Sequence, residues 1–278
     1  MGLLINGQVG WRVAGVVGTS SGQDSDALAF ITAATITNTT QQNAINTLVT
    51  DLKGYGIWSK MKAIYPFVGG NATSHKFNLK DPRDLDAAYR LAFIGGWTHG
   101  NGVIPNGTNA YANTFLTPST HMTIANFAHL SYYSSTNSQK SFEYVMGGGD
   151  ATSALALIGR RNTNLQAYFS NNIGSTYDVA SNSTGTTGTG FLVGTQLATT
   201  IKLFRNNTLQ ASNTTASTGL STPTKPIFFG CSNNNGVAIG FTDKTCLFSS
   251  IGEGLTDTES ANLYAAVQTY QTTLGRQV

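Results

Sequence analysis

Two polar loops in this sequence have residue types that recognise carbohydrates. The first, residues 95–101, places Trp97, His99 and Asn101 among three glycines, and the second, residues 232–236, carries Asn233 and Asn234. An aromatic ring can stack on a sugar while amide and imidazole groups bond its hydroxyls, so these five residues are the predicted sugar-facing site. The alternatives are that Trp97 belongs to the core and that both loops only turn corners of a β fold.

The acidic residues argue against glycoside hydrolysis. Such an enzyme needs two carboxylates at a fixed separation, often within a Glu-x-Asp-x-x-Glu strand. Glu143 has no acidic residue two or five positions away, Glu253 lies in a glycine-flanked turn, and Glu259 fits a helix cap. Ser131 follows His129 by two residues, but no Gly-x-Ser-x-Gly elbow is present. We therefore predict no enzyme activity and keep an atypical glycan hydrolase as the least favoured alternative.

Metal and disulfide signals are weak. Asp81, Asp84 and Asp86 lie close together but lack the glycine and terminal glutamate of a twelve-residue calcium loop. One Ca²⁺ held partly by backbone carbonyls is left open, and no other cofactor is expected. Cys231 and Cys246 are the only cysteines and form no Cys-x-x-Cys zinc motif. We interpret them as two buried thiols, with a disulfide as the alternative if their strands are neighbours.

Charge and composition narrow the class of protein. Charged residues make up 10% of the 278 residues, with 31 glycines, against about 25% charged residues in ordinary soluble domains. The net charge is +3, and the seven basic residues between Lys53 and Arg90 are interleaved with aspartates, so a solvated face is favoured over a nucleic-acid site. No run of eighteen apolar residues could span a membrane, and Arg12 interrupts the only run that could serve a signal peptide.

Short strands separated by polar turns dominate the sequence after residue 57 and predict a β-sandwich. The clearest signal is a hairpin in which residues 200–204 and 208–210 flank Asn206 and Asn207, which tolerate the positive φ of a tight turn. A polar turn is expected at residues 232–236. Further strands are expected at residues 76–79, 87–93, 112–116, 128–134, 141–146, 153–160, 165–169, 190–194, 226–231, 238–241 and 246–251.

Three helices are expected beside the strands. Asp24 or Ser25 can cap the first, which runs to about residue 34, and Thr39 or Thr40 can cap the second, which runs to about residue 53. Thr256 begins the last helix, because it forms a capping box with Glu259. The apolar face of the second helix consists of Ala44, Ile45, Leu48, Val49 and Leu52, and that of the last consists of Leu263, Val267, Tyr270 and Leu274.

These signals divide the chain into three parts. Residues 1–23 are glycine-rich and apolar with one charge at Arg12, and are predicted to be an arm that assembles with a neighbouring subunit. Residues 24–57 are predicted to be a helical segment packed on the sandwich or on a partner. Residues 58–278 are predicted to be the sandwich with its C-terminal helix.

The later part of the chain resembles a known fold family. An Asn-rich hairpin, the "IFFG" strand and a last strand that runs into "LTDTESANLY" resemble the concanavalin A-like, laminin-G-like jelly rolls over roughly residues 76–277. The resemblance implies a mainly β, concanavalin A-like jelly-roll sandwich with N-terminal helices and one C-terminal helix.

A second resemblance extends over more of the chain. The segments "AINTLVTDLKGYGIWSKMKAIYPFVGG" (residues 44–70), "HKFNLKDPRDLDAAYRLAFIGGWTHGNGV" (75–103) and "LTDTESANLYAAVQTYQTTLGR" (255–276) are similar to tailed-bacteriophage virion proteins. This implies a non-enzymatic structural protein of the virion, displayed on the capsid or tail for decoration or adhesion. The alternative is a carbohydrate-binding module of a tail or head fibre that recognises the host receptor.

The partners follow from these resemblances and from the charge pattern. Other virion proteins, contacted through residues 1–23, and further copies of the chain are the expected protein partners. A host surface glycan is the expected ligand of the alternative function. No nucleic acid and no membrane is expected as a partner, and the expected location is the virion.

Overall fold

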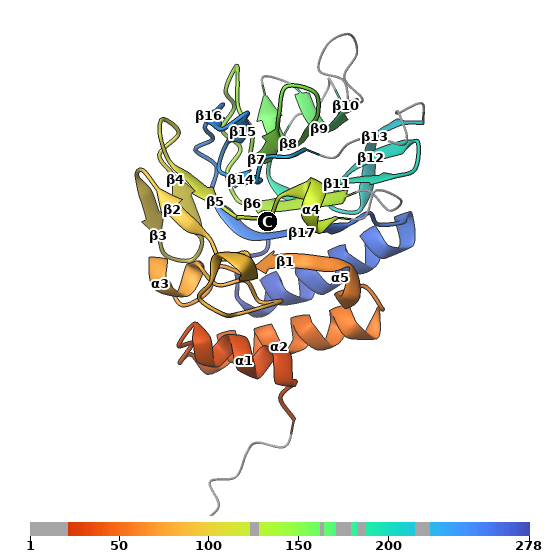
Figure 1. Cartoon of the computed structure of the whole chain (residues 1–278). Helices are drawn as coiled ribbons and strands as arrows, with labels where there is room; N and C mark the ends of the chain where they lie inside the picture. The colour runs from red at the N-terminus through yellow and green to blue at the C-terminus, as the bar shows by residue number, and fades with distance from the viewer. Residues whose placement is uncertain (1–21, 123–127, 162–163, 171–178, 183–186, 215–222) are drawn as a thin grey trace, which may run out of the picture.

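Two β-sheets packed face to face form the body of the protein in this computed structural model, which describes residues 22–122, 128–161, 164–170, 179–182, 187–214 and 223–278 (Figure 1). The strands of the first sheet are β1 (Met61–Tyr65), β3 (Trp97–His99), β4 (Val103–Pro105), β6 (Ala128–Ser134), β11 (Gly190–Leu197), β12 (Thr200–Arg205), β13 (Thr208–Asn213) and β17 (Cys246–Glu253). Their order is β13-β12-β11-β6-β17-β4-β3, and β1 also pairs with β17.

The second sheet contains the remaining nine strands that the structure describes. They are β2 (Ala92–Ile94), β5 (Tyr111–Asn113), β7 (Met146–Gly149), β8 (Ala154–Arg161), β9 (Asn164–Ser170), β10 (Val179–Asn182), β14 (Phe228–Phe229), β15 (Ser232–Asn234) and β16 (Val237–Ile239). Their order is β10-β9-β8-β7-β14-β5-β2, and β15 pairs with β7 and β16. The predicted mainly β jelly-roll sandwich is confirmed.

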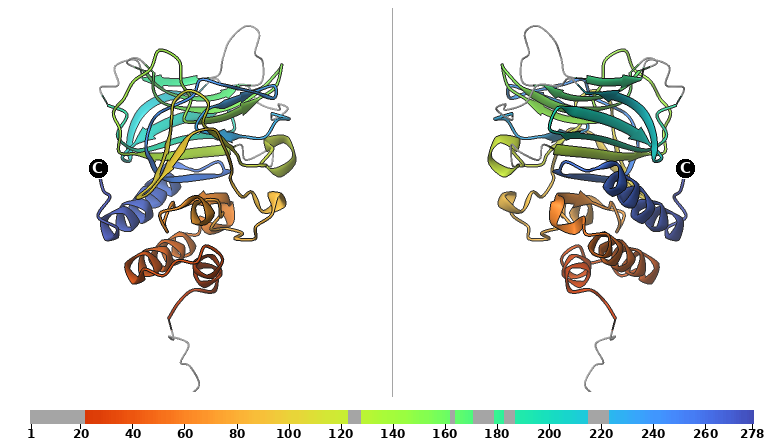
Figure 2. Two further views of the ribbon diagram at one scale, coloured as in Figure 1. Left: turned by 90° about the vertical axis from the view of Figure 1, so that its left-hand side faces the viewer. Right: turned by 90° about the vertical axis from the view of Figure 1, so that its right-hand side faces the viewer.

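Helices form a third layer on the outer face of the first sheet (Figure 2). They are α1 (Ser25–Ala33), α2 (Thr39–Gly54) and α5 (Asp257–Thr273), and α2 lies against both α1 and α5. The short helices are α3 (Ala72–His75), α4 (Pro118–His121), η1 (Trp58–Lys60) and η2 (Asp86–Ala88). None of the described helices has the length and apolar character needed to cross a bilayer.

The three layers enclose two hydrophobic cores. One lies between the helices and the first sheet and includes Leu48 of α2, Val267 of α5 and Phe248 of β17. The other lies between the sheets and includes Leu130 of β6 and Phe229 of β14. Because β6 and nearly all of β17 are buried on both faces, the first sheet is the central layer of the molecule.

Several local signals in the sequence are confirmed by this arrangement. Thr256 and Glu259 make both hydrogen bonds of the capping box at the start of α5. Asn206 and Asn207 have φ angles of 46° and 60°, so the β12–β13 turn is the tight hairpin that the sequence predicts. The predicted apolar face of α2 is fully buried, and so is that of α5 apart from Leu274, which is half-buried.

Other expected elements are absent or shifted. Residues 76–79 form no strand, because the Asn78 side chain instead bonds the backbone of Lys62, Ile64 and Ala88 and holds this segment across the end of β1. In place of the expected strand at residues 87–93 the structure has β2 at residues 92–94, and the strand expected at 141–146 is shifted to β7 at residues 146–149. The predicted turn at residues 232–236 is mostly β15, and the turn itself lies at Asn235 and Gly236.

The predicted arm at residues 1–23 lies outside the described residues except for its last two positions. The helical segment that follows it is packed on the sandwich through α1 and α2.

Candidate ligand-binding site

The five predicted sugar-facing residues lie in both sheets of the sandwich. Trp97 and His99 belong to β3 of the first sheet and Asn101 to the turn after it, whereas Asn233 and Asn234 belong to β15 of the second sheet. The two loops that the sequence indicates therefore belong to different sheets, and each residue has to be judged by its own contacts.

Trp97 is half-buried and packs against the core between the two sheets. Its indole N–H donates to the carbonyls of Ile94 (3.0 Å) and Tyr111 (3.2 Å). Its ring stacks on Phe229 at 5.9 Å and meets the edge of Phe93 at 5.1 Å. This is the arrangement of the core alternative, since the polar atom and the ring face are both engaged.

The two asparagines of β15 differ in their surroundings. Asn233 is 1% exposed, and its side chain donates to the Pro226 carbonyl and accepts from the Gly236 N–H. It fixes the β15–β16 turn. Asn234 is exposed on the same hairpin.

His99 pairs with His75 at the edge of the first sheet. The two Nδ1 atoms are 3.0 Å apart, so one ring donates and the other accepts. Burial lowers the pKa of His75 to about 3, aided by His99 and Arg276, and burial lowers the pKa of His99. Both rings are therefore neutral at pH 7. His75 also contacts the edge of Phe67 at 5.7 Å.

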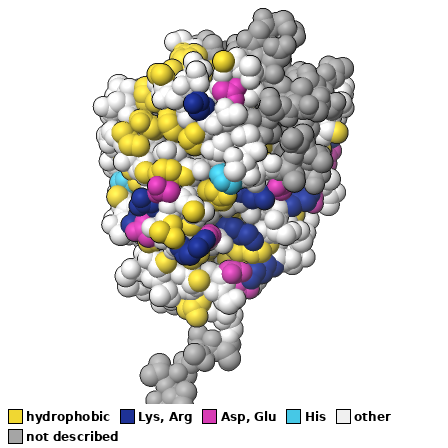
Figure 3. All heavy atoms as spheres, viewed as in Figure 1, with side chains coloured by type: hydrophobic (Ala, Val, Ile, Leu, Met, Phe, Trp, Pro, Cys, Tyr) yellow, Lys and Arg dark blue, Asp and Glu magenta, His cyan; other side chains and the backbone are white. Residues whose placement is uncertain are grey.

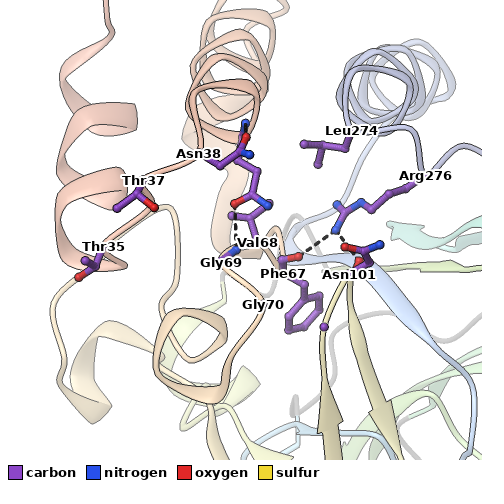
Figure 4. A pocket seen from close by; sticks show the side chains of 12 residues that line it. Thr35, Thr37, Asn38, Phe67, Val68, Gly69, Gly70, Asn101, Leu274 and Arg276 are labelled. Carbon is purple, nitrogen blue, oxygen red and sulfur yellow. Dashed lines mark hydrogen bonds between the residues drawn. The ribbon is translucent and has the colours of Figure 1, made fainter.

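A pocket of about 260 Å³ lies beside this histidine pair, where the α1–α2 connection, the loop after β1, the β3–β4 turn and the end of α5 meet (Figure 4). Its polar lining residues are Thr35, Thr37, Asn38, Gln41, Asn101 and Arg276. Figure 4 shows the first three on one side and Asn101 and Arg276 on the other. Asn101 is the predicted site residue that lines this pocket.

Strained backbone forms part of the pocket wall. Thr35 and Phe67 have φ angles of 53° and 48°, in the left-handed region that β-branched and bulky residues rarely adopt. Gly69 and Gly70 are left-handed as well, with φ angles of 88° and 73°. A Cβ on Gly69 would come within 2.5 Å of the Ser74 Oγ, so only glycine fits there.

The polar groups of the pocket are partly used by the fold. Asn38 Oδ1 accepts from the Gln41 N–H and caps α2, and Gln41 Oε1 accepts from the Gly69 N–H at 3.1 Å. Within the described residues, the Thr35 and Thr37 hydroxyls and the amide of Asn101 have no hydrogen-bond partner in the structure. These groups can both donate and accept, as a sugar hydroxyl requires.

Arg276 holds the far side of the pocket together. Its guanidinium donates to the carbonyls of Phe67 (2.8 Å), Asn101 (2.7 Å) and Leu247 (3.0 Å), and more distantly to that of Pro66. Its Nε donates to Gln271 Oε1 at 2.9 Å. One side chain therefore ties the end of α5 to the β1 loop, the β3–β4 turn and β17.

Two sequence signals indicate parts of this pocket. The Gly69–Gly70 pair directly follows the aromatic segment after β1, and a Gly-Gly dipeptide marks a turn with unusual backbone angles. Arg276 follows the last helix, where a basic residue is common. Nothing in the spacing indicates that these segments meet.

The three glutamates are all engaged in ion pairs. Glu143 and Lys244 pair at 0% exposure, and the Thr242 hydroxyl donates to Glu143 Oε2 at 3.0 Å. Glu253 pairs with Lys62, and Glu259 pairs with Lys60 in addition to capping α5. Each glutamate thus has a role in the fold.

The buried histidine and serines of the first sheet form a hydrogen-bonded group. His129 Nε2 is 3.0 Å from Ser250 Oγ, and Ser250 Oγ is 2.7 Å from Ser131 Oγ. All three residues are 0% exposed, and burial lowers the pKa of His129 to about 4. Because no substrate can reach them, the group belongs to the interior.

Basic and acidic side chains alternate along one face of the molecule (Figure 3). Six of the seven basic residues between Lys53 and Arg90 pair with carboxylates. The seventh, Lys80, lies 4.2 Å from the centroid of the Trp58 ring. This is the solvated face that the sequence favours.

The aspartates and cysteines also have assigned places. Asp81 pairs with Arg83, Asp84 with Lys76 and Arg90, and Asp86 with Arg90. The described residues contain no group of three or more His, Cys, Asp or Glu that could hold a metal ion.

The two cysteines are free and buried, as the sequence favours. Cys246 begins β17 in the first sheet, whereas Cys231 lies between β14 and β15 in the second.

Comparison with known proteins places the fold. Neither a protein-family model nor a curated protein matches the chain. The binding domain of botulinum neurotoxin serotype D is 14% identical over 76% of this chain and 52% of that one, with a TM-score of 0.51. The chain therefore spans about half of that toxin domain and shares its fold.

Two looser likenesses have lower scores. Domain 4 of AbnA, a GH43 extracellular arabinanase from Geobacillus stearothermophilus solved with arabinotriose, is 13% identical over 74% of this chain and 98% of that one, with a TM-score of 0.48. The CBM40 of the Ruminococcus gnavus IT-sialidase, bound to α2,3 sialyllactose, is 12% identical over 50% of this chain and 79% of that one, with a TM-score of 0.40.

Proposed function

We propose that this chain is a non-catalytic, glycan-binding jelly-roll module whose ligand occupies the pocket between α2, the β1 loop, the β3–β4 turn and the end of α5. The observation that carries the proposal is the pocket wall itself. Thr35 and Phe67 hold left-handed backbone at the pocket, and strain of this kind costs of order 1–3 kcal/mol per residue. Residues with strained backbone cluster at ligand-binding sites, where the unusual geometry positions groups for the ligand.

The chemistry of the lining supports a glycan. Two threonines and Asn101 line the cavity, and the hydroxyl or amide of each can donate to and accept from a sugar hydroxyl. Val68 and Leu274 add apolar surface for the C–H groups of the ring. The toxin domain that shares this fold is itself a binding domain.

The absence of catalysis rests on the inventory of carboxylates. Glycoside hydrolysis needs two of them facing the sugar, and no glutamate or aspartate is among the described residues that line the pocket. The three glutamates are paired with lysines elsewhere in the fold.

Display on a bacteriophage particle is a prediction that rests on the sequence resemblance. In that setting the module would sit on a capsid or tail, with residues 1–23 joining it to other virion proteins. Many copies on one particle would raise the avidity for a host surface glycan far above the affinity of a single site.

An immobilised glycan array tests the proposal. We expect the parent protein to bind at least one glycan and Asn101→Ala to bind it at least tenfold more weakly, because the side-chain amide is lost. Asn234→Ala is the matched control, since Asn234 is equally an exposed asparagine but lies on β15.

Two results would contradict the proposal. Failure of the parent protein to bind any glycan would leave a purely structural role. Loss of binding in Asn234→Ala with full binding in Asn101→Ala would move the site to the β15–β16 hairpin.

A further inference from the structure

The pocket also indicates which class of glycan it takes. Building on the function proposed above, we infer that it recognises the terminal residue of a neutral glycan, one uncharged sugar ring, rather than an acidic sugar or the interior of a chain. Three features of the pocket carry this inference: its charge, its size and the way its floor is built.

Arg276 is the only charged residue among the described residues that line the pocket. A sugar carboxylate would need free, parallel N–H donors from such a guanidinium. The five donors of Arg276 are already matched by five oxygens, four from backbone carbonyls and one from Gln271. An acidic sugar would therefore have to displace bonds that hold four segments together.

The neighbouring groups do not replace this missing donor. The His75 and His99 rings are neutral at pH 7, because burial lowers the pKa of both. The remaining polar lining consists of hydroxyls and amides, which suit sugar hydroxyls and do not compensate a full negative charge.

The size of the cavity favours a single ring. Its volume of about 260 Å³ lies below the range of about 300–1,000 Å³ that holds larger ligands. Its walls come from four different segments, and the Arg276 bonds to Phe67 and Asn101 close it on the side of the β3–β4 turn. A sugar in the middle of a chain needs open space on both sides, and these bonds close one of them.

The floor of the pocket allows close approach without stacking. Gly69, Gly70 and Gly100 expose backbone there, and the aromatic lining residue, Phe67, is 1% exposed. Binding must then come mainly from hydrogen bonds to the hydroxyls of the one ring that the pocket holds, so the further sugars of a longer chain would add little.

Isothermal titration with simple glycosides tests this inference. The probes are methyl glycosides of neutral hexoses and N-acetylhexosamines, and the matching uronic acids and N-acetylneuraminic acid. We expect a neutral glycoside to bind and the acidic form of the same ring to bind at least tenfold more weakly. The dissociation constant should change less than threefold from the monosaccharide to its linear tetrasaccharide.

Two variants assign any binding to this pocket. Thr37→Val replaces a lining hydroxyl by a methyl of the same shape and should weaken binding at least fivefold. Thr258→Val makes the same change at an exposed position of α5 and should leave binding unchanged.

The outcomes separate this inference from the function on which it rests. Preferential binding of an acidic sugar, or affinity that rises steeply with chain length, would overturn the inference and leave a glycan-binding module. Absence of binding to every glycoside and to every glycan of the array would overturn both.

Discussion

The fully buried pair of Glu143 and Lys244 yields the sharpest stability prediction. Both side chains are 0% exposed, the carboxylate also accepts from the Thr242 hydroxyl, and the Lys244 carbonyl accepts from the Tyr132 hydroxyl at 2.7 Å. Lys244→Met removes the ammonium that pairs with this carboxylate at zero exposure. Breaking a buried pair in this way costs about 3–5 kcal/mol, a large part of the 5–15 kcal/mol that stabilises a typical fold.

The double variant Glu143→Met/Lys244→Met distinguishes the pair from its parts. With both charges gone, apolar side chains of similar length fill the space, and the remaining cost is about 1–2 kcal/mol for the Thr242 hydroxyl that loses its acceptor. Urea unfolding followed by fluorescence and circular dichroism measures Lys244→Met, Glu143→Met and the double variant. Losses that simply add in the double variant would refute the reasoning, because they would show that the two charges do not depend on each other.

Four further predictions concern helix α5, Arg276, His129 and residues 1–23. Val267→Asp should lower the free energy of unfolding by more than about 4 kcal/mol, because Val267 is 0% exposed on the buried side of α5. Ala265→Asp, on the exposed side of the same helix, should lower it by less than about 1 kcal/mol. Equal losses in urea unfolding would mean that α5 does not pack on the sheet. Arg276→Ala should lower the free energy of unfolding by about 2–4 kcal/mol, since it removes charge-assisted hydrogen bonds to four segments. Arg276→Lys should recover less than half of that loss. A loss below about 1 kcal/mol in Arg276→Ala would show that these hydrogen bonds do not stabilise the fold. The pKa of His129 is lowered from about 6.5 in the unfolded chain to about 4. The neutral ring therefore contributes at most roughly 3 kcal/mol to the free energy of unfolding, fully above pH 6.5 and progressively less as the pH falls toward 4. His129→Gln should flatten this part of the curve of unfolding free energy against pH, and an unchanged curve would contradict the assignment. Deletion of residues 1–23 should leave a folded sandwich that no longer self-associates in sedimentation, and unfolding of the truncated chain would place these residues in the core.

The sequence predicted those parts of the fold that depend on interactions between residues close together in the chain. The capping box at Thr256, the Asn206–Asn207 turn and the apolar face of α2 each depend on residues within one or two turns of chain, and each is confirmed. The strand at residues 128–134 was also predicted with the bounds that the structure has.

Errors appear where distant segments decide the outcome. Residues 76–79 have a strand-like pattern, yet the Asn78 side chain bonds three backbone groups of other segments and keeps the chain out of the sheet. The polar run at residues 232–236 has the composition of a turn, but pairing with β7 makes most of it a strand. In both cases tertiary hydrogen bonds override the local preference.

The candidate site was predicted least well, for the same reason. Asn101 was the one predicted site residue that lines the pocket, and Trp97 and Asn233 are held by the fold. The pocket joins residues 35–41, 67–70, 100–101 and 274–276, which lie far apart in the sequence. No spacing rule brings such segments together before the fold is known.

Amide chemical-shift mapping of the isotopically labelled protein with a bound neutral sugar tests the central claim most directly. The account predicts that the shifted resonances cluster at residues 35–41, 68–70 and 100–101, around the pocket of Figure 4. The β15–β16 hairpin should stay unchanged. Shifts centred on residues 232–239, or no shifts at saturating concentrations of any sugar that the array identifies, would contradict the assignment of the pocket as the ligand site.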